Sequence, residues 1–304
     1  MEEKKLFKVS SNPLVRTKRD TTSIMLDVII ALIPALAVGT YMFGIKVVLL
    51  LAVNVFACVF FEWGYRKLLK KPQSVGDLSA VVTGFLLTCV LPSEATWWMG
   101  VIGSFFAIVV VKQLYGGIGK NFLNPALAGR AFLTAGYAAV MTSWAVPTTL
   151  AGVVDGATMA TPLSYLKAGE ALPEYFDLTS LFLGGVPGSI GEISALALLA
   201  GAAYLLIRKV ITWRIPTAFI GTVAVLCLVF GKSGYGRVDW TLYNLLSGGL
   251  ILGAFFMATD YSTSPVTLRG QLLFGVGCGA LTVLIRYFGS YPEGVSYAIL
   301  IMNC

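Results

Sequence analysis

The stretch SIMLDVIIALIPALAVGTYMF, residues 23–43, and the following KVVLLLAVNVFACVFFEW, residues 46–63, decide the fold class of this chain. Each is apolar over about 20 residues, the length of helix that crosses the hydrocarbon layer of a membrane. The apolar residues run together instead of alternating, which favours helices over the strands of a membrane barrel. Basic residues before the first stretch and after the second predict that both flanks, and so the N-terminus, are cytoplasmic.

The composition agrees with a membrane protein. Of 304 residues, 57% are hydrophobic and only 12% are charged, about half the charged share of a soluble domain. The net charge is +7, and its lysines and arginines lie beside apolar spans, as the orientation rule for membrane proteins requires. A nucleic-acid interface needs a basic, aromatic-bearing soluble surface, which is absent from the sequence pattern. We therefore predict an all-α polytopic protein that contacts membrane lipid and no nucleic acid.

Histidine is absent, so a haem held by histidine and a histidine general base are both excluded. Five cysteines occur without any C-x-x-C pair and are interpreted as small buried hydrophobic residues, although a cluster bound across helices stays open. No metal site and no independent catalytic residue is predicted. The cysteines are Cys58, Cys89, Cys227, Cys278 and Cys304.

About ten membrane spans are predicted from the apolar runs. The last begins near residue 295 and is too short to cross ~30 Å of hydrocarbon, so the C-terminus is expected to be truncated. Four charged residues near span ends, Glu62, Asp77, Lys112 and Asp260, are expected to be solvated. The other spans cover residues 23–43, 46–63, 78–91, 97–115, 124–141, 190–207, 216–230, 242–258 and 272–288.

Similar Gly-led apolar runs at 84–87 and 249–252 suggest two related halves. Five spans in each half would give the repeats opposite orientations, and inverted repeats with broken helices form a binding site where the breaks meet. The predicted domains are a cytoplasmic tail (1–22), a first membrane repeat (23–142), an extracytoplasmic loop (143–189) and a second membrane repeat (190–304).

The predicted loop contains DGATMATPL, residues 155–163. Asp155 and Gly156 favour a tight bend. Pro162 disfavours helix at the residue before it, so Thr161 is predicted to be extended, and we expect its hydroxyl to project from an exposed segment. On these residues alone, an ordinary polar loop is the alternative.

The pattern Asp155-x-x-Thr158-x-Ala160-Thr161 resembles the flavinylation motif Asp-x-x-(Ser/Thr)-x-Ala-(Ser/Thr). In proteins with that motif the last hydroxyl bears FMN through a phosphoester bond, which a separate flavin transferase makes outside the cytoplasm. Two more stretches match the same source: GKNFLNPALAGR (119–130) and YPEGV (291–295). Over nearly its whole length the chain resembles the family that contains RnfD of the Rnf complex and NqrB of the sodium-pumping NADH:quinone oxidoreductase.

The resemblance implies that Thr161 bears covalent FMN and that the transferase reads Asp155, Thr158 and Ala160. Met159 departs from the glycine of many relatives. A second flavin, riboflavin, is associated with this family, and the candidate site is near Asn124 and Arg130 at a helix start beside several glycines.

The family further implies a urea-channel-like fold in a prokaryotic cytoplasmic (inner) membrane, with the flavin loop on the extracytoplasmic side. Its function would be to relay electrons between partner subunits of types A, B, C, E and G. This relay would couple ferredoxin:NAD electron transfer to movement of Na+ or H+. Two alternatives are a cofactor-free secondary transporter or channel of the same fold, and a structural component that anchors partners without a redox group.

Overall fold

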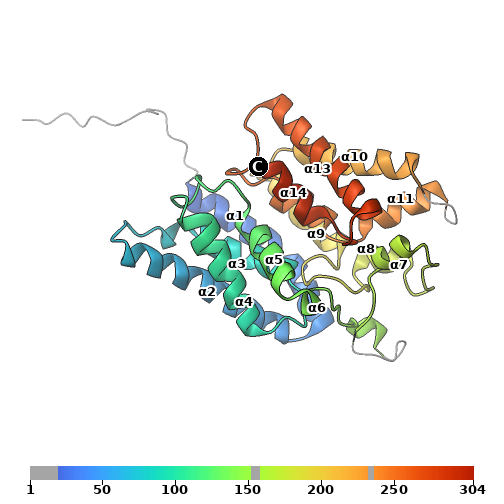
Figure 1. The fold of residues 1–304 in the computed structure, drawn as a ribbon, viewed down its shortest axis with the longest axis horizontal. Coiled ribbons are helices and arrows are strands. Elements are labelled where there is room, and N and C mark those ends of the chain that lie inside the picture. Colours follow the sequence, from blue (N-terminus) through green and yellow to red (C-terminus); the bar gives the residue numbers. More distant parts are fainter. Residues whose placement is uncertain (1–19, 152–157, 232–235) are drawn as a thin grey trace, which may run out of the picture.

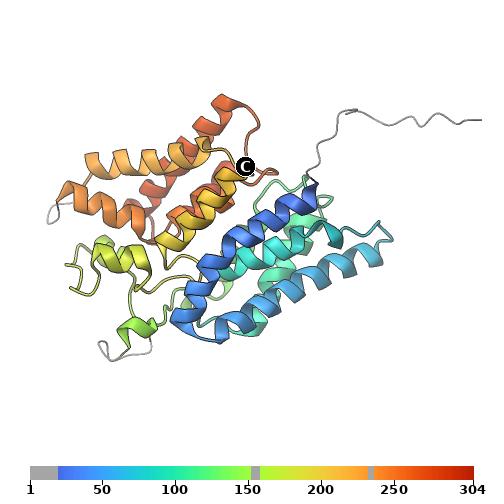
Figure 2. The same cartoon turned by 180° about the vertical axis from the view of Figure 1, so that it is seen from behind.

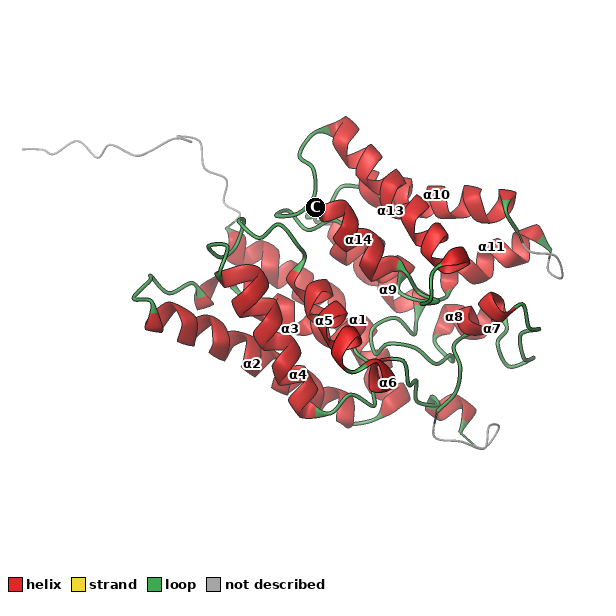
Figure 3. Ribbon diagram, in the orientation of Figure 1, coloured by secondary structure: helices red, strands yellow, loops and turns green. Residues whose placement is uncertain are grey.

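The computed structural model describes residues 20–151, 158–231 and 236–304. Within these ranges the regular elements are helices, and an isolated β-bridge pairs Ala145 with Thr158. Figure 1 shows two groups of helices side by side, an earlier one in blue and green and a later one in yellow to red. Figure 3, in the same orientation, shows that the described elements are helices joined by loops. The all-helical prediction is confirmed for these residues.

The first group forms around the two long helices quoted above. Gly84 permits its closest approach, because a Cβ there would lie 2.8 Å from the Val55 Cα. Helices α2 and α3 therefore pack backbone to backbone, as small residues allow in membranes. The group consists of α1 (Thr21–Phe43), α2 (Lys46–Leu68), α3 (Ser79–Val90), α4 (Trp97–Phe105), the π-helix η2 (Phe106–Gln113) and α5 (Pro125–Gly136).

The second group contains one long helix and several short ones. Helix α10 lies along α13, where a Cβ on Gly275 would lie 2.7 Å from the Ala218 Cβ. The group consists of α9 (Ala195–Ile207), α10 (Arg214–Val229), α11 (Arg237–Leu246), α12 (Leu250–Leu252), the π-helix η4 (Gly253–Met257), α13 (Leu268–Phe288) and α14 (Val295–Asn303).

Helices α1 and α9 join the two groups, as the view from behind shows (Figure 2). Their contact includes an ion pair of 3.2 Å between Asp27 and Arg208. The short elements of the chain lie between or beside the groups. They are η1 (Val75–Asp77), α6 (Ala138–Met141), η3 (Thr148–Leu150), α7 (Pro162–Ala168) and α8 (Leu178–Leu183).

In the described part of the chain, three helices are long and apolar enough to cross a membrane: α1, α2 and α13. Helix α11 and the α12–η4 segment form a fourth candidate if they count as one span bent by 63°. Shorter apolar helices lie in four more of the predicted spans, at 78–91, 97–115, 190–207 and 216–230. The chain thus has the helices of a multi-pass membrane protein, while ten crossings and two inverted repeats stay predictions.

Two charged residues that were predicted to be solvated are buried. Glu62 and Lys112 are 0% and 3% exposed, and their side chains pair at 2.7 Å. The prediction is wrong because α2 continues to Leu68, more than a turn beyond the predicted span end at Trp63. Glu62 therefore lies on the face of α2 that packs against the first helix group. Asp77 and Asp260 are half-buried.

Candidate functional site

Two pockets of similar size lie along α5. The Asn124 pocket has a volume of about 430 Å³ and the Arg130 pocket about 450 Å³. Asn124 caps the start of α5, and Arg130 follows six residues later, or about 9 Å along the helix at the α-helical rise. The two residues expected to share a second flavin site therefore face different pockets.

The three sequence stretches that resemble the flavin-bearing family meet at the Arg130 pocket. Thr158, Met159 and Ala160 line it, opposite the Tyr291–Gly294 segment and Arg130 itself. Met159 is held by a hydrogen bond from its N–H to the Trp144 carbonyl oxygen, 2.9 Å. Asp155, the first residue of the motif, lies outside the described residues.

Aromatic and hydroxyl side chains give this pocket its chemical character. Trp144, Tyr291 and Tyr297 line it, and the two tyrosine rings stack with centroids 5.6 Å apart and an interplanar angle of 24°. Thr134 and Thr142 add hydroxyl groups. A mostly apolar cavity of several hundred Å³ with a few convergent polar groups is the usual form of a cofactor site.

Thr161 begins α7 and is extended as predicted, with φ −76° and ψ 157°. Its hydroxyl accepts a hydrogen bond from the Ser164 N–H and lies 2.9 Å from the Ser164 Oγ. The residue is not exposed as predicted, because this capping role turns the hydroxyl inward and leaves Thr161 only 5% exposed. Ser164 lines the Arg130 pocket, while Thr161 borders an adjoining cavity of about 20 Å³.

The wall between the pocket and the small cavity carries buried charges. Arg130 forms a close ion pair with Glu293 and a longer one, 3.4 Å, with Glu192. It also donates to the Ser296 Oγ at 3.1 Å. Burial raises the pKa of Glu192, which lies in the link before α9, to about 7, and the nearby negative charge of Glu293 adds to this effect.

Sequence reasoning missed Glu192. The residue is an isolated acid between Gly191 and the apolar start of α9, and it is 6% exposed. Its only sequence signal is a carboxylate at the start of a predicted span, a position that more often carries a solvated charge. Glu293, by contrast, lies inside the Tyr-Pro-Glu-Gly stretch that the sequence analysis singled out.

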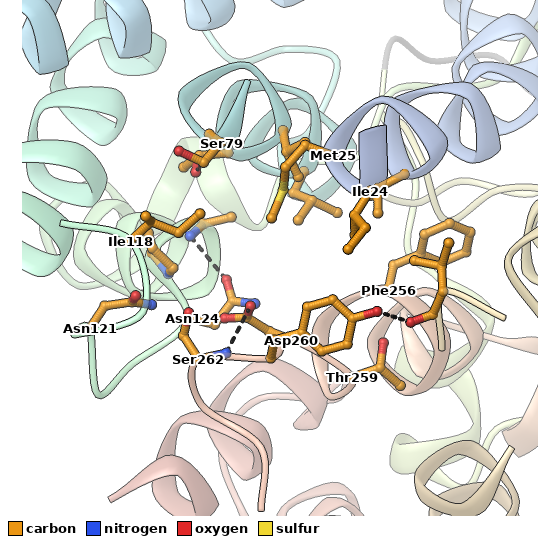
Figure 4. Close-up of a pocket in the computed structure, with 18 of the residues that line it drawn as sticks. Ile24, Met25, Ser79, Ile118, Asn121, Asn124, Phe256, Thr259, Asp260 and Ser262 are labelled. Carbon is orange, nitrogen blue, oxygen red and sulfur yellow. Dashed lines mark hydrogen bonds between the residues drawn. The ribbon is translucent and has the colours of Figure 1, made fainter. Parts of the chain in front are cut away.

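The Asn124 pocket is built from both helix groups (Figure 4). Ile24, Met25 and Ser79 lie on one side of the space, and Asn124 and Asp260 lie on the other. The Asn124 side chain accepts from the Ala126 and Leu127 N–H groups at 3.1 and 3.3 Å and donates to the Met257 carbonyl at 3.3 Å. One amide thus caps α5 and joins it to η4.

Lys112 reaches the same pocket from η2. Its ammonium group donates to the Glu62 Oε2 and to the Ser79 hydroxyl. The other oxygen of Glu62 accepts from the Ser74 hydroxyl. Both oxygens of this carboxylate and the charge of the cation therefore have partners within the protein.

Comparison with known proteins assigns the chain to a family. Residues 8–304 match the model of the NQR2, RnfD, RnfE family. The chain belongs to this family. It is 53% identical over 298 residues to the D subunit of the Na(+)-translocating ferredoxin:NAD(+) oxidoreductase complex of Acetobacterium woodii, covering 97% of this chain and 90% of the relative.

Two further relatives carry related names. The D subunit of the proton-translocating ferredoxin:NAD(+) oxidoreductase complex of Clostridium ljungdahlii is 42% identical over 308 residues, 99% of this chain and 92% of the relative. The D subunit of the ion-translocating oxidoreductase complex of Stutzerimonas stutzeri is 39% identical over 307 residues, 92% of this chain and 87% of the relative.

Proposed function

We propose that this chain is a membrane component of a redox-driven, ion-translocating ferredoxin:NAD oxidoreductase and that it carries FMN on Thr161. The family and the names of the relatives support the complex. The observation that carries the flavin proposal is the meeting of Thr158–Ala160, Arg130 and Tyr291–Gly294 around one pocket. Its partners would be the other subunits of the complex and the flavin transferase.

The residues around the Arg130 pocket fit a flavin. The pocket volume of about 450 Å³ accommodates a cofactor of this size, and Tyr291, Tyr297 and Trp144 offer flat apolar surfaces to a ring system. Arg130 and Glu293 add charged groups to the wall, where they form an ion pair. The Thr161 hydroxyl lies next to Ser164, itself a lining residue.

A bound flavin supplies the ability to exchange one or two electrons and so to link one-electron carriers. The chain's own residues would hold and tune it. The aromatic side chains would exclude water and fix the ring plane. Arg130, held in place by its ion pair with Glu293, would present its guanidinium group to the ring.

The Asn124 pocket is the proposed site of a second, non-covalent flavin of the riboflavin type. Its support is a volume of about 430 Å³ with apolar walls from Ile24 and Met25 and polar groups at Asn124 and Asp260. The proposal assigns Asn124 to this second site and Arg130 to the first, because each residue lines only its own pocket.

The proposed membrane arrangement follows from charge. Basic residues precede α1 and follow α2, which favours a cytoplasmic location for both. The Thr161 segment would then face the extracytoplasmic side of the prokaryotic cytoplasmic membrane. The transported ion is Na+ or H+, since the two relatives named above differ in this respect.

Flavin fluorescence of the denatured protein tests the attachment. Wild type, Thr161→Ala and Thr161→Ser would each be expressed with a flavin transferase and run on a denaturing gel. We expect a fluorescent band for wild type and Thr161→Ser, because the motif accepts either hydroxyl, and none for Thr161→Ala. Thr142→Ala is the matched control, because Thr142 is an exposed hydroxyl residue that lines the same pocket outside the motif.

A dark wild-type band, with the transferase active on a control substrate, would overturn the covalent flavin. A cofactor-free transporter would then be the leading function.

For the second flavin, Met25→Trp should fill the Asn124 pocket and abolish the flavin released from Thr161→Ala protein on denaturation. Leu26→Trp is the control, because Leu26 is 48% exposed and outside the pocket.

A further inference from the structure

Glu192 is a buried carboxylate that the protein does not fully neutralise. It is 6% exposed, and its Oε2 is among the few buried side-chain atoms of the described residues with no hydrogen-bond partner. Its Oε1 has a long contact, 3.4 Å, to Arg130. A buried carboxylate needs donors or a close cation to stay ionised, and without them it becomes protonated instead.

The surroundings explain why one arginine does not suffice. Arg130 stands between Glu192 and Glu293 and makes its close ion pair with Glu293. Arg286 is the other buried cation nearby. Its guanidinium group donates hydrogen bonds to the backbone oxygens of Asn244, Ser247 and Glu293. Of the two carboxylates in this cluster, Glu192 therefore has its negative charge offset less completely by nearby cations.

The remaining neighbours of Glu192 offset burial only in part. The hydroxyl of Ser189, in the same link, lowers the pKa of Glu192 somewhat, and the thiol of Cys89 lies nearby on α3 but is a weak donor. Gly249 approaches from the link before α12, and a Cβ there would overlap the Glu192 Oε1. The glycine is required because the carboxyl group fills the space that a side chain would take. The titratable and charged groups that face Glu192 are thus Arg130, Glu293, Arg286 and Cys89.

A small cavity adjoins the carboxyl group. This cavity of about 20 Å³ touches Thr161, Glu192, Ser247 and Glu293, and a space of this size holds one water molecule. The Ser247 Oγ is also without a hydrogen-bond partner. Two unpartnered polar groups thus border one cavity that has room for a water molecule, the usual carrier of a proton to a buried carboxyl group.

We propose that Glu192 is an exchangeable proton site, reached through the cavity beside Thr161, that takes up a proton when negative charge is added to the Arg130 pocket. The step balances simply. The Glu192 carboxylate takes a proton from a hydronium ion, which leaves as water, so that one O–H bond forms as another breaks. The compensating electron comes from a one-electron donor protein of the complex and would reside on the flavin that the proposed function assigns to this pocket. The proton site stands on the chain's own residues, and only the source of the charge rests on the proposed function.

Infrared spectroscopy of protein that lacks the covalent FMN tests the proton site by itself. The full chain with Thr161→Ala would be titrated in lipid nanodiscs between about pH 5 and pH 9, and the stretch of the protonated carboxyl group would be followed. Exposed carboxyl groups titrate below this window. We expect one band that disappears with a midpoint near pH 7, is absent after Glu192→Gln, and persists after Glu174→Gln, a control at an exposed acid.

Glu293→Gln gives a second, directional test. Without the Glu293 charge, Arg130 becomes the partner of Glu192 alone, so the band should disappear at a lower pH than before. This variant keeps Glu192 in place and so covers the case in which Glu192→Gln fails to fold. A band that is missing in the Thr161→Ala protein, or that is unmoved by Glu293→Gln, would overturn the proton site.

The link to added charge is tested in flavin-loaded protein by redox titration. One proton taken up per electron changes the equilibrium tenfold per pH unit, or about 59 mV. We expect the midpoint potential to fall less steeply with pH around neutrality in Glu192→Gln than in wild type and Glu174→Gln. Equal slopes would overturn the link. If no flavin is attached at all, the proposed function fails while the infrared result still decides the proton site.

Discussion

A buried charge cluster lies beside each pocket, and the clusters differ in how completely they are neutralised. Beside the Asn124 pocket, Lys112 pairs with Glu62, and both oxygens of Glu62 have partners. In the Arg130 pocket, one arginine faces both Glu192 and Glu293, and one oxygen of Glu192 has no partner. A change of charge in the first cluster can only destabilise the folded protein, whereas the second cluster can gain or lose a proton at a small cost in free energy.

This difference separates a structural role from a chemical one. A satisfied ion pair fixes the packing of α2 against η2, and breaking it leaves an isolated buried charge. An incompletely neutralised carboxylate has two charge states of similar energy, which is the property of groups at functional sites. Two pockets of similar volume therefore lie beside charge clusters whose expected roles differ.

The largest expected effect comes from breaking the satisfied pair. Lys112→Met leaves Glu62 buried without its cation and should lower the free energy of unfolding by about 3–5 kcal/mol. Lys120→Met, at an exposed lysine a few residues later, should change it by less than about 0.5 kcal/mol. Thermal denaturation in detergent measures both. Adding Glu62→Gln to Lys112→Met should restore most of the loss, and a double variant as unstable as the single one would contradict the pairing.

A pH-dependent effect is expected at the incompletely neutralised cluster. The pKa of Glu192 is about 7 in the folded chain against an ordinary 4.5. The folded state therefore binds more protons between these values, and stability is greatest below about pH 4.5 and is lost as pH rises through 7. The difference of 2.5 in pKa (7 minus 4.5) corresponds to about 3 kcal/mol at most.

Glu192→Gln removes this dependence, so the variant should gain stability over wild type as the pH rises from about 5 to 8. Denaturation midpoints of both proteins across that range supply the measurement, with Glu174→Gln as the control. Curves that stay parallel would show that Glu192 does not titrate in the folded protein.

A smaller effect is expected from steric change at the same cluster. Gly249→Ala places a methyl group against the Glu192 carboxyl and should cost about 1–3 kcal/mol by overpacking. Gly64→Ala in α2 has no neighbour within 4 Å and should be neutral or stabilising by up to about 1 kcal/mol. Equal outcomes for the two glycines, measured by thermal denaturation, would argue against close packing at Glu192.

The smallest effect is expected at the exposed ion pair between the helix groups. Arg208 is 46% exposed, and Asp27 keeps a hydrogen bond of 2.9 Å from the Tyr204 hydroxyl without it. Arg208→Gln should therefore cost less than about 1 kcal/mol. A loss comparable with that of Lys112→Met would show that exposure does not set the strength of these pairs.

The sequence predicts the helices well where hydrophobicity decides them. The span predicted at 78–91 appears as Ser79–Val90, because a continuous apolar run between Asp77 and Pro92 leaves little choice. The span predicted at 242–258 is interrupted between Leu246 and Leu250. The local run of Ser and Gly at 247–249 permits this break. The reason for a glycine at 249 is not local, because the carboxyl group of Glu192, from a distant part of the chain, occupies the space next to it.

The residues of the candidate site likewise include some that the sequence predicts and some that it does not. Arg130 and the Thr158–Thr161 segment were found because motifs are local in sequence. Glu192 was missed because its burial and its competition with Glu293 for one arginine arise only when α5, α9 and α14 pack together. Exposure of Thr161 was predicted wrongly for a related reason: a hydroxyl at a helix start can cap that helix, and the prediction of a polar loop does not include the cap.

The inward cap at Thr161 bears on when the proposed flavin could be attached. A transferase of ordinary size does not reach a hydroxyl that is 5% exposed and engaged with Ser164. For the attachment proposed here, the enzyme must therefore act before the seven residues of α7 close over the hydroxyl. The fraction of protein that carries FMN would then depend on the rate of flavin attachment relative to the rate at which α7 folds. The amount of transferase present during membrane insertion would matter more than its affinity for the folded protein.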